Sequence, residues 1–388
     1  MYILTLLLNL SLSQGFLYNI LLSDIMDDLL KKENSALYEI ISFFKDTKSA
    51  VVSFSGGKDS LVALDLARRA GIKKAIFSDT TIEDKITLKY IINLQNFIDV
   101  SIDILKPKVD FFTLFDEYGP PSRRYRWCCP TIKYPQIVEY ARKNNIKYMI
   151  TGLRKSESNI RSKYEIIGIN PMTPNVKEFN PIIDWTEKDV FSYIKNHNLP
   201  LNPIYNLGFK RNGCVICPYK KISEIEKYKT IEPELLEKFE KKLQNYVSKI
   251  NPYDPKKFLL GGWVLWTPKQ KKLYAGIINN SGIIISNKIL ELDNNPYALI
   301  NLADTERDLI TALEKRINCT GCGACISFCP SGALFLEHGK INVNNNLCSH
   351  CKLCISNKYL RGACTARNYR VDKFSIKIRN KEDFNEKT

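Results

Sequence analysis

Short apolar runs alternate with amphipathic stretches along the first 250 residues of the chain. Runs typical of buried strands occupy residues 50–54, 74–80, 100–107 and 145–152. Between them, and over residues 24–47, apolar positions recur every three or four residues, which predicts helices. Strands that alternate with helices indicate an α/β fold built on a doubly wound parallel sheet.

Polar or small residues follow three of these runs. Ser55, Asp79 and Gly152 all fall at the carboxyl ends of expected strands. In doubly wound sheets, ligands bind just beyond that edge. We therefore expect these three positions to converge on a ligand site.

The pattern changes after residue 250. Residues 273–286 predict a β-hairpin that turns about Asn280–Gly282, and residues 303–317 predict a short helix. From Cys319 onward, Cys and Gly replace the core-forming apolar runs. We expect five parts: a helical segment 1–47, an α/β domain 48–250, a small α+β connecting segment 251–315, a cysteine-rich domain 316–370 and a tail 371–388.

The charge balance favours an anionic partner. The 388 residues include 57 Lys and Arg against 41 Asp and Glu, a formal net charge of +16. A generally Lys-rich proteome would give the same balance, so charge does not identify a site. Residues 1–22 are apolar, but no basic residue precedes them, no small-residue cleavage site follows, and polar residues interrupt them. We expect a cytoplasmic protein without a membrane partner.

A glycine-rich turn, Ser55–Ser60, separates the first expected strand from a helix. Glycines let a backbone approach an anion closely, and the free N–H groups of a helix amino terminus favour phosphate. The spacing is not the Walker pattern, since only Ser-Gly-Gly precedes Lys58. A tight turn without a ligand is the alternative.

Four segments carry a resemblance to a known family: "SFSGGKDS" (53–60), Asp79-Thr80-Thr81 with Glu83, "TGLRKSESNIR" (151–161), and the stretch 180–219. The first resembles the PP-loop of ATP pyrophosphatases and of the related phosphoadenosine phosphosulfate (PAPS) reductase family, and the other three resemble later segments of that family.

The resemblance implies an adenine nucleotide held at a defined set of positions. The implied nucleotide-binding residues are Ser53, Ser55, Gly56, Gly57, Lys58, Asp59, Ser60, Asp79, Thr80, Gly152 and Arg154. Lys58, Arg154 and Arg161 are the expected catalytic residues. Guanidinium groups pair bidentately with phosphate or sulfate, so the two arginines would act as anion clamps. Exposed arginines without a ligand are the alternative.

The C-terminal cysteines have the spacing of a bacterial ferredoxin with two [4Fe–4S] clusters. Cys319, Cys322, Cys325 and Cys329 form the first run, and Cys348, Cys351 and Cys354 begin the second. Cys364 follows after nine residues rather than three. The ferredoxin pattern assigns Cys319, Cys322, Cys325 and Cys364 to one cluster and Cys329, Cys348, Cys351 and Cys354 to the other. Zinc is the alternative, although it seldom uses this spacing.

Four cysteines remain: the adjacent pair Cys128 and Cys129, and Cys214 with Cys217. Their pattern resembles adenylyl-sulfate (APS) reductases, in which such a set holds one [4Fe–4S] cluster. The resemblance implies a third cluster beside the nucleotide; zinc or buried thiols are the alternatives. All 12 cysteines are then assigned to iron, and no Glu-Cys-Gly segment supplies the nucleophile that sulfonucleotide reductases use.

Three functions fit these motifs. The first is an iron–sulfur reductase that converts APS or PAPS to sulfite, with electrons entering from a low-potential donor such as ferredoxin through the C-terminal clusters. The second is an ATP-dependent sulfurtransferase that thiolates a tRNA or a small molecule. The third is a nucleotide-sensing electron carrier. The reductase is favoured because residues 120–220 resemble the reductases most closely. The sequence leaves the oligomeric state open.

Overall fold

A six-stranded sheet forms the centre of the molecule. The computed structural model describes residues 28–173, 175–267, 275–278, 282–285, 288–291, 315, 319–351 and 353–354. The strand order is β3-β2-β1-β4-β6-β5, and every neighbouring pair is parallel except β5 with β6. The strands are β1 (Ala50–Ser53), β2 (Lys74–Ser78), β3 (Ser101–Leu105), β4 (Tyr148–Ile150), β5 (Ile167–Ile169) and β6 (Lys177–Phe179). The predicted α/β class is confirmed.

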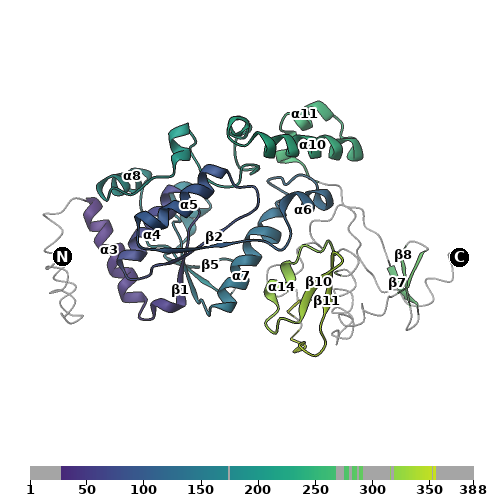
Figure 1. Cartoon of the computed structure of the whole chain (residues 1–388), viewed down its shortest axis with the longest axis horizontal. Helices are drawn as coiled ribbons and strands as arrows, with labels where there is room; N and C mark the ends of the chain where they lie inside the picture. The colour runs from purple at the N-terminus through teal and green to yellow at the C-terminus, as the bar shows by residue number, and fades with distance from the viewer. Residues whose placement is uncertain are drawn as a thin grey trace.

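Helices cover both faces of this sheet (Figure 1). One face packs against α3 (Asp28–Phe43), α4 (Lys58–Arg69), α5 (Lys85–Phe97) and α8 (Glu187–Asn196). The other packs against α7 (Tyr134–Lys143). Because side chains alternate along a strand, Val52 belongs to the first layer and its neighbour Val51 to the second.

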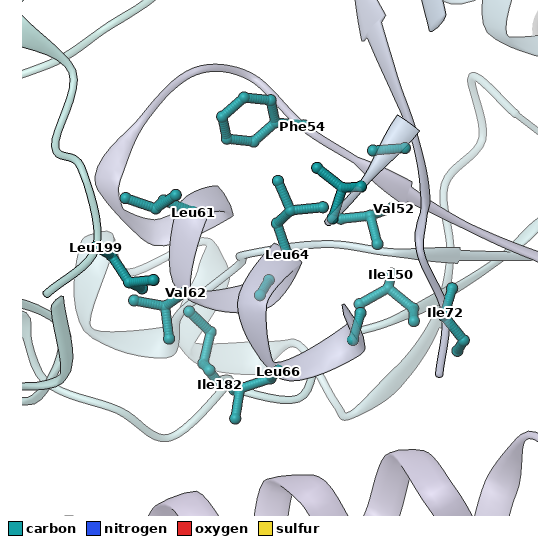
Figure 2. Close-up of a cluster of buried hydrophobic side chains, with 14 of the residues drawn as sticks. Val52, Phe54, Leu61, Val62, Leu64, Leu66, Ile72, Ile150, Ile182 and Leu199 are labelled. Atoms are coloured by element: carbon teal, nitrogen blue, oxygen red, sulfur yellow. The ribbon is translucent and has the colours of Figure 1, made fainter. Parts of the chain in front are cut away.

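Helix α4 is enclosed by apolar side chains, as Figure 2 shows. Leu61, Val62, Leu64 and Leu66 all have no exposed surface. Most of the residues of α4 are buried, so its position relative to β1 is fixed by packing. Its end agrees with the sequence, because Gly71 follows at φ +90°. The amino terminus of α4 is thereby held at the end of β1.

The strand order places a topological switch point at the carboxyl ends of β1 and β4, and this position is called here the crevice. The chain passes from β1 through β2 to β3 on one side, then returns to β4 on the other side of β1. Adjacent parallel strands whose connections run in opposite directions leave such an opening, and ligands of α/β proteins occupy it. The glycine-rich turn after β1 and the segment after β4 both border it.

A second buried cluster lies beside the sheet. It is built by α6 (Phe111–Tyr118), α9 (Ile222–Lys227), α10 (Pro233–Ile250) and α11 (Pro255–Leu259) together with the segment that carries the adjacent cysteines. That segment continues as the π-helical turn η2 (Cys129–Lys133) into α7. The short 3₁₀ helices are η1 (Thr47–Ser49), η3 (Lys155–Glu157), η4 (Arg161–Lys163), η5 (Pro203–Leu207), η6 (Tyr228–Thr230) and η7 (Gly262–Leu265).

The C-terminal part contains two small sheets. The expected hairpin is confirmed, since β7 (Ala275–Ile278) pairs antiparallel with β8 (Gly282–Ile285), which pairs with β9 (Lys288–Glu291). In the cysteine-rich part, α14 (Ala324–Phe328) precedes the hairpin of β10 (Leu334–Glu337) and β11 (Lys340–Val343). Helix α14 lies beside α7 (Figure 1). The cysteine-rich part is therefore packed on the α/β domain.

Several expectations fall outside the described residues. They concern the segment before residue 28, the helix over residues 303–317 apart from residue 315, Cys364 and the tail 371–388. Among the helices that are described, none is both long enough and apolar enough to cross a membrane.

Candidate functional site

The glycine-rich turn takes the form that the sequence predicts for an anion cradle. Gly57 caps α4 and Lys58 is its first helical residue, so the free N–H groups of the helix face the crevice. Gly56 has φ +75°, and a Cβ there would lie 2.8 Å from Asn212 Nδ2. The hydroxyl of Ser60 accepts from the Ser55 N–H at 3.2 Å and donates to the Gly57 carbonyl at 2.9 Å. These hydrogen bonds of the Ser60 hydroxyl fix the conformation of the turn.

A distant segment, residues 202–212, braces this turn from outside. The Asn202 side-chain amide donates to the Gly56 carbonyl at 3.0 Å, and that of Asn212 donates to the Ser55 carbonyl at 2.7 Å. The Tyr205 hydroxyl accepts from the Lys58 N–H at 3.0 Å. These residues were not singled out from the sequence. Only their place within the matched stretch 180–219 pointed toward them.

Arg154 and Lys58 meet at one carboxylate. Arg154 is only 3% exposed, and its Nε donates to Asp59 Oδ1 at 2.6 Å. The Lys58 ammonium lies 3.1 Å from the other oxygen of Asp59 and 3.3 Å from Glu187 Oε1. Burying a guanidinium requires a partner charge, and Asp59 supplies it. Two of the three expected catalytic residues are thus brought together at the amino terminus of α4.

Gly152 lets the segment after β4 approach the turn closely. A Cβ at this position would stand 2.5 Å from the carbonyl carbon and oxygen of Asp59 and 2.6 Å from the Ser60 nitrogen. Those atoms are backbone and cannot rotate away. Among the standard residues, glycine alone fits this contact, which seats Arg154 against α4.

Arg161, the third expected catalytic residue, lies in η4 beside Arg211. It pairs with Glu157, one turn earlier in the chain. Burial, followed by the nearby positive charge of Arg211, lowers the pKa of the Arg161 guanidinium. Arg161 is half-buried and Arg211 is exposed, and two neighbouring positive charges attract an anion. Arg211 was missed by the sequence reading, because nothing local distinguishes it from a surface arginine.

The remaining nucleotide positions lie at the ends of β1 and β2. Ser53 is the last residue of β1. Asp79 follows β2, and its carboxylate accepts from the Thr81 N–H at 2.7 Å, which fixes the turn. The Thr80 hydroxyl donates to Glu83 at 2.7 Å and lies 3.2 Å from Cys214 Sγ. This turn therefore joins the crevice to the cysteines.

Cys128, Cys129, Cys214 and Cys217 form a half-buried group of neighbouring thiols, called here the thiol quartet. A hydrogen bond with Cys128 lowers the pKa of Cys129, and the charges of Arg126 and Lys133 act in the same direction against the effect of burial. Burial raises the pKa of the Cys214 thiol, as does the nearby carboxylate of Glu83. A thiolate is the form that binds metal.

The donor set of the quartet fits a [4Fe–4S] cluster. Three cations surround it: Arg126 and Lys133 near Cys129, and Lys220 near Cys214. The Lys220 ammonium is anchored by the Gly213 carbonyl at 2.7 Å. Positive charge around four thiolates suits an anionic cluster, whose ligands are spread over four irons. Within the described residues, no three Cys, His, Asp or Glu side chains converge as the ligands of a single ion would.

The C-terminal cysteines divide into two groups. Cys354 lies within electrostatic reach of Cys351, Cys329 and Cys348. This grouping is consistent with the expected assignment of Cys329 to the cluster of Cys348, Cys351 and Cys354, although Cys329 follows the first cysteine run in the sequence. Cys319 and Cys322 lie on the loop that enters α14 and Cys325 lies in α14 itself, while their expected fourth partner, Cys364, lies outside the described residues.

Comparisons with known protein families match two separate regions of the chain. A family model of the phosphoadenosine phosphosulfate reductase domain matches residues 49–220, and one of the 4Fe-4S binding domain matches residues 318–335. An uncharacterised protein of Methanocaldococcus jannaschii is 32% identical over 255 residues, covering 64% of this chain and 60% of that protein. A second one from the same organism is 33% identical, and the match covers 63% of this chain and 53% of that protein. The chain thus spans less than two thirds of either relative.

An adenosine 5′-phosphosulfate reductase of Staphylococcus haemolyticus is 29% identical over 188 residues, covering 46% of this chain and 75% of that enzyme. Among solved structures, a phosphoadenylyl-sulfate reductase from Candida auris is 18% identical with a TM-score of 0.38, covering 53% of this chain and 96% of that one. Residues 49–220 are therefore a domain of the phosphoadenosine phosphosulfate reductase family, and a 4Fe-4S binding motif follows at residues 318–335.

Proposed function

We propose that the chain reduces an adenylyl sulfate, APS or PAPS, to sulfite. The observation that carries this proposal is the thiol quartet, which adjoins the nucleotide crevice through Thr80 and Glu83. A redox group at the mouth of a nucleotide site suits a reaction on the group attached to the nucleotide's phosphate. The similarity to enzymes named APS reductase supports the same reaction.

Different residues of the crevice would bind different parts of the substrate. The turn Ser55–Ser60 and the first N–H groups of α4 would hold the phosphate. Tyr205 now takes the Lys58 N–H, so phosphate would either displace its hydroxyl or bind beside it. Arg161, which lies within electrostatic reach of both Asp59 and Arg211, would receive the sulfate together with Arg211. Arg154, tied to Asp59, would keep the turn in place rather than move with the ligand.

The reaction balances with two electrons. The sulfur–oxygen bond to the phosphate breaks, the bridging oxygen remains with the adenosine nucleotide, and sulfur is reduced from the sulfate to the sulfite level. Bound [4Fe–4S] clusters would supply these electrons one at a time. A low-potential carrier such as reduced ferredoxin is the reductant. Because all 12 cysteines are assigned as ligands, no thiol is left to act as a nucleophile, and the clusters would supply both electrons instead.

The test is anaerobic incubation of the cluster-loaded chain with APS or PAPS and reduced ferredoxin, without ATP. Sulfite should appear together with AMP, or with adenosine 3′,5′-bisphosphate from PAPS. In a Cys129→Ser variant, iron content should fall by about four per chain and sulfite formation should stop. Pyrophosphate release from ATP, with no sulfite from either sulfonucleotide, would instead establish the ATP-dependent sulfurtransferase.

A further inference from the structure

The cysteine-rich part is seated on the α/β domain through a specific contact surface. Helix α14 packs along α7 and against η2, directly behind the adjacent cysteines. Ser327 donates to Glu139 of α7 at 3.3 Å. Gly323 approaches Lys108 so closely that a Cβ would lie 2.8 Å from the lysine Cβ. The contact therefore involves fixed backbone as well as side chains.

One line of contacts crosses this surface. The hydroxyls of Thr320 and Tyr118 share a hydrogen bond of 2.7 Å. The Tyr118 ring lies 5.0 Å, centroid to centroid, from the indole of Trp127. Trp127 is covalently followed by Cys128. Thr320, in turn, follows Cys319. One hydrogen bond and one ring contact are thus the only non-covalent steps between a ferredoxin-type cysteine and the quartet.

The rings on this line are rigidly held. Trp127 has no exposed surface, and its indole N–H donates to the Gly119 carbonyl at 3.0 Å. Phe111 stacks on its other face at 5.2 Å. Cys322, only 9% exposed, belongs to the same buried cluster as these side chains. Close packing leaves no gap in which the contact could be lost.

The two ends of the cysteine-rich part differ in exposure. In the second group, Cys351 is exposed, Cys348 and Cys354 are half-buried and Cys329 is buried. In the first group, Cys319 is half-buried and Cys322 and Cys325 are buried, Cys322 within the cluster that contains Tyr118 and Trp127. A soluble electron donor could approach most closely at Cys351. Electrons would therefore enter at the exposed side of the cysteine-rich part and move along the line of contacts toward the quartet.

We propose that Tyr118 and Trp127 form the path by which electrons pass from the Cys319–Cys325 loop to the thiol quartet. The inference rests on the proposed reductase function, which requires electrons at the quartet. Electron tunnelling weakens much faster across empty space than along bonds and hydrogen bonds. The path through Thr320, Tyr118 and Trp127 crosses space only at the contact between the two packed rings.

The step moves one electron at a time and makes or breaks no bond. The donor side is oxidised by one electron and the quartet side is reduced by one, with a low-potential ferredoxin as the external reductant. Tyr118 and Trp127 stay chemically unchanged, because they act as the medium and not as carriers. Tyr118→Phe and Thr320→Val each remove one partner of the hydrogen bond while keeping the shape of the side chain.

The experiment follows reduction of the quartet after rapid mixing of the cluster-loaded full chain with a reduced ferredoxin. Freeze-quenched electron paramagnetic resonance spectra give its rate, and a Cys129→Ser variant gives the spectrum without the quartet's contribution. Tyr118→Phe and Thr320→Val should each slow the rate severalfold, and the double variant should be no slower than the slower single one. Trp127→Phe, which shortens the ring, should also slow it. Midpoint potentials and iron content should not change.

Tyr140→Phe is the matched control. It also removes one tyrosine hydroxyl bond, to Asp103 at 2.7 Å, from a helix that α14 contacts, but lies off the path. Its rate should equal that of the unaltered chain. Wild-type rates in Tyr118→Phe, Thr320→Val and Trp127→Phe would overturn the path while leaving the reductase proposal intact. Absence of the quartet's iron in the unaltered chain would overturn both, whereas a reducible quartet without sulfite formation would overturn the reductase alone.

Discussion

Replacing Gly152 by alanine tests whether the close approach of two loops builds the nucleotide site. The new methyl group would stand 2.5 Å from the Asp59 carbonyl, where ordinary contact begins at 3.4 Å. The opposing atoms are backbone at the start of α4, and α4 is fixed by the core. Relief therefore requires the two loops to separate by about 0.9 Å.

Two effects of this separation should be measurable. Overpacking of this kind costs about 1–3 kcal/mol of unfolding free energy. A displacement of about 1 Å in a binding loop can cost roughly 100-fold in function, so affinity for nucleotide should fall more than stability suggests. Gly152→Ala should therefore bind AMP, the nucleotide part shared by APS and ATP, far more weakly.

The assay pairs isothermal titration with AMP and urea denaturation of the same preparations. Gly168→Ala is the matched control, because nothing lies within 4 Å of a Cβ there. It should change neither quantity. If Gly152→Ala kept wild-type affinity and wild-type stability, the two loops would not be in the close contact that these distances indicate. The inference that this contact builds the site would then be wrong.

Three further changes probe the core, the buried arginine and a helix cap. Leu64→Ala, at a fully buried position of α4, should lower the free energy of unfolding by about 3 kcal/mol in urea denaturation, and a loss below 1 kcal/mol would contradict the packing. Arg154→Lys keeps the charge but loses the guanidinium fork that holds Asp59, so AMP should bind about 2 kcal/mol more weakly by titration; unchanged affinity would remove Arg154 from the site. Asp110 caps α6, and replacing it by alanine should cost about 1 kcal/mol at pH 7. Partial burial would raise the pKa of Asp110, but its hydrogen bonds, chiefly from Thr113, outweigh this and lower it. The carboxylate's contribution is then present above its unfolded pKa of about 3.9 and is lost as pH falls through the lower folded value, so the difference between the two chains should shrink below about pH 4; a constant difference in denaturation across that range would contradict this.

Local features of the fold were readable from the sequence because they depend on local patterns. The runs at residues 50–54 and 145–152 became β1 and β4, and the glycine-rich turn lies between β1 and α4 as expected. Strands β5 and β6 were not predicted, whereas β4, which is also three residues long, lies within a longer apolar run. Three residues are too few to display an alternation of period two, so their place depends on the sheet they join.

The long-range parts of the site could not be read in the same way. Arg154 was expected to contact an anion, yet its resting partner is Asp59, 95 residues away. Tyr205 and Arg211 come from loops without periodicity, and only the folded chain brings them to the crevice. The packing of α14 against α7 could likewise not be predicted, because the sequence of neither helix indicates its partner.

The central place of β1 has a consequence for motion. Its backbone is hydrogen-bonded to β2 on one edge and β4 on the other, and both of its faces are covered by helices. Amide protons of Val51 and Val52 should therefore exchange with deuterated solvent only when the whole domain unfolds, while those of residues 155–163, outside the sheet, exchange by local opening. The glycine-rich turn is thus attached to a strand that opens only with the whole domain, while the segment beside it that carries Arg161 can adjust locally.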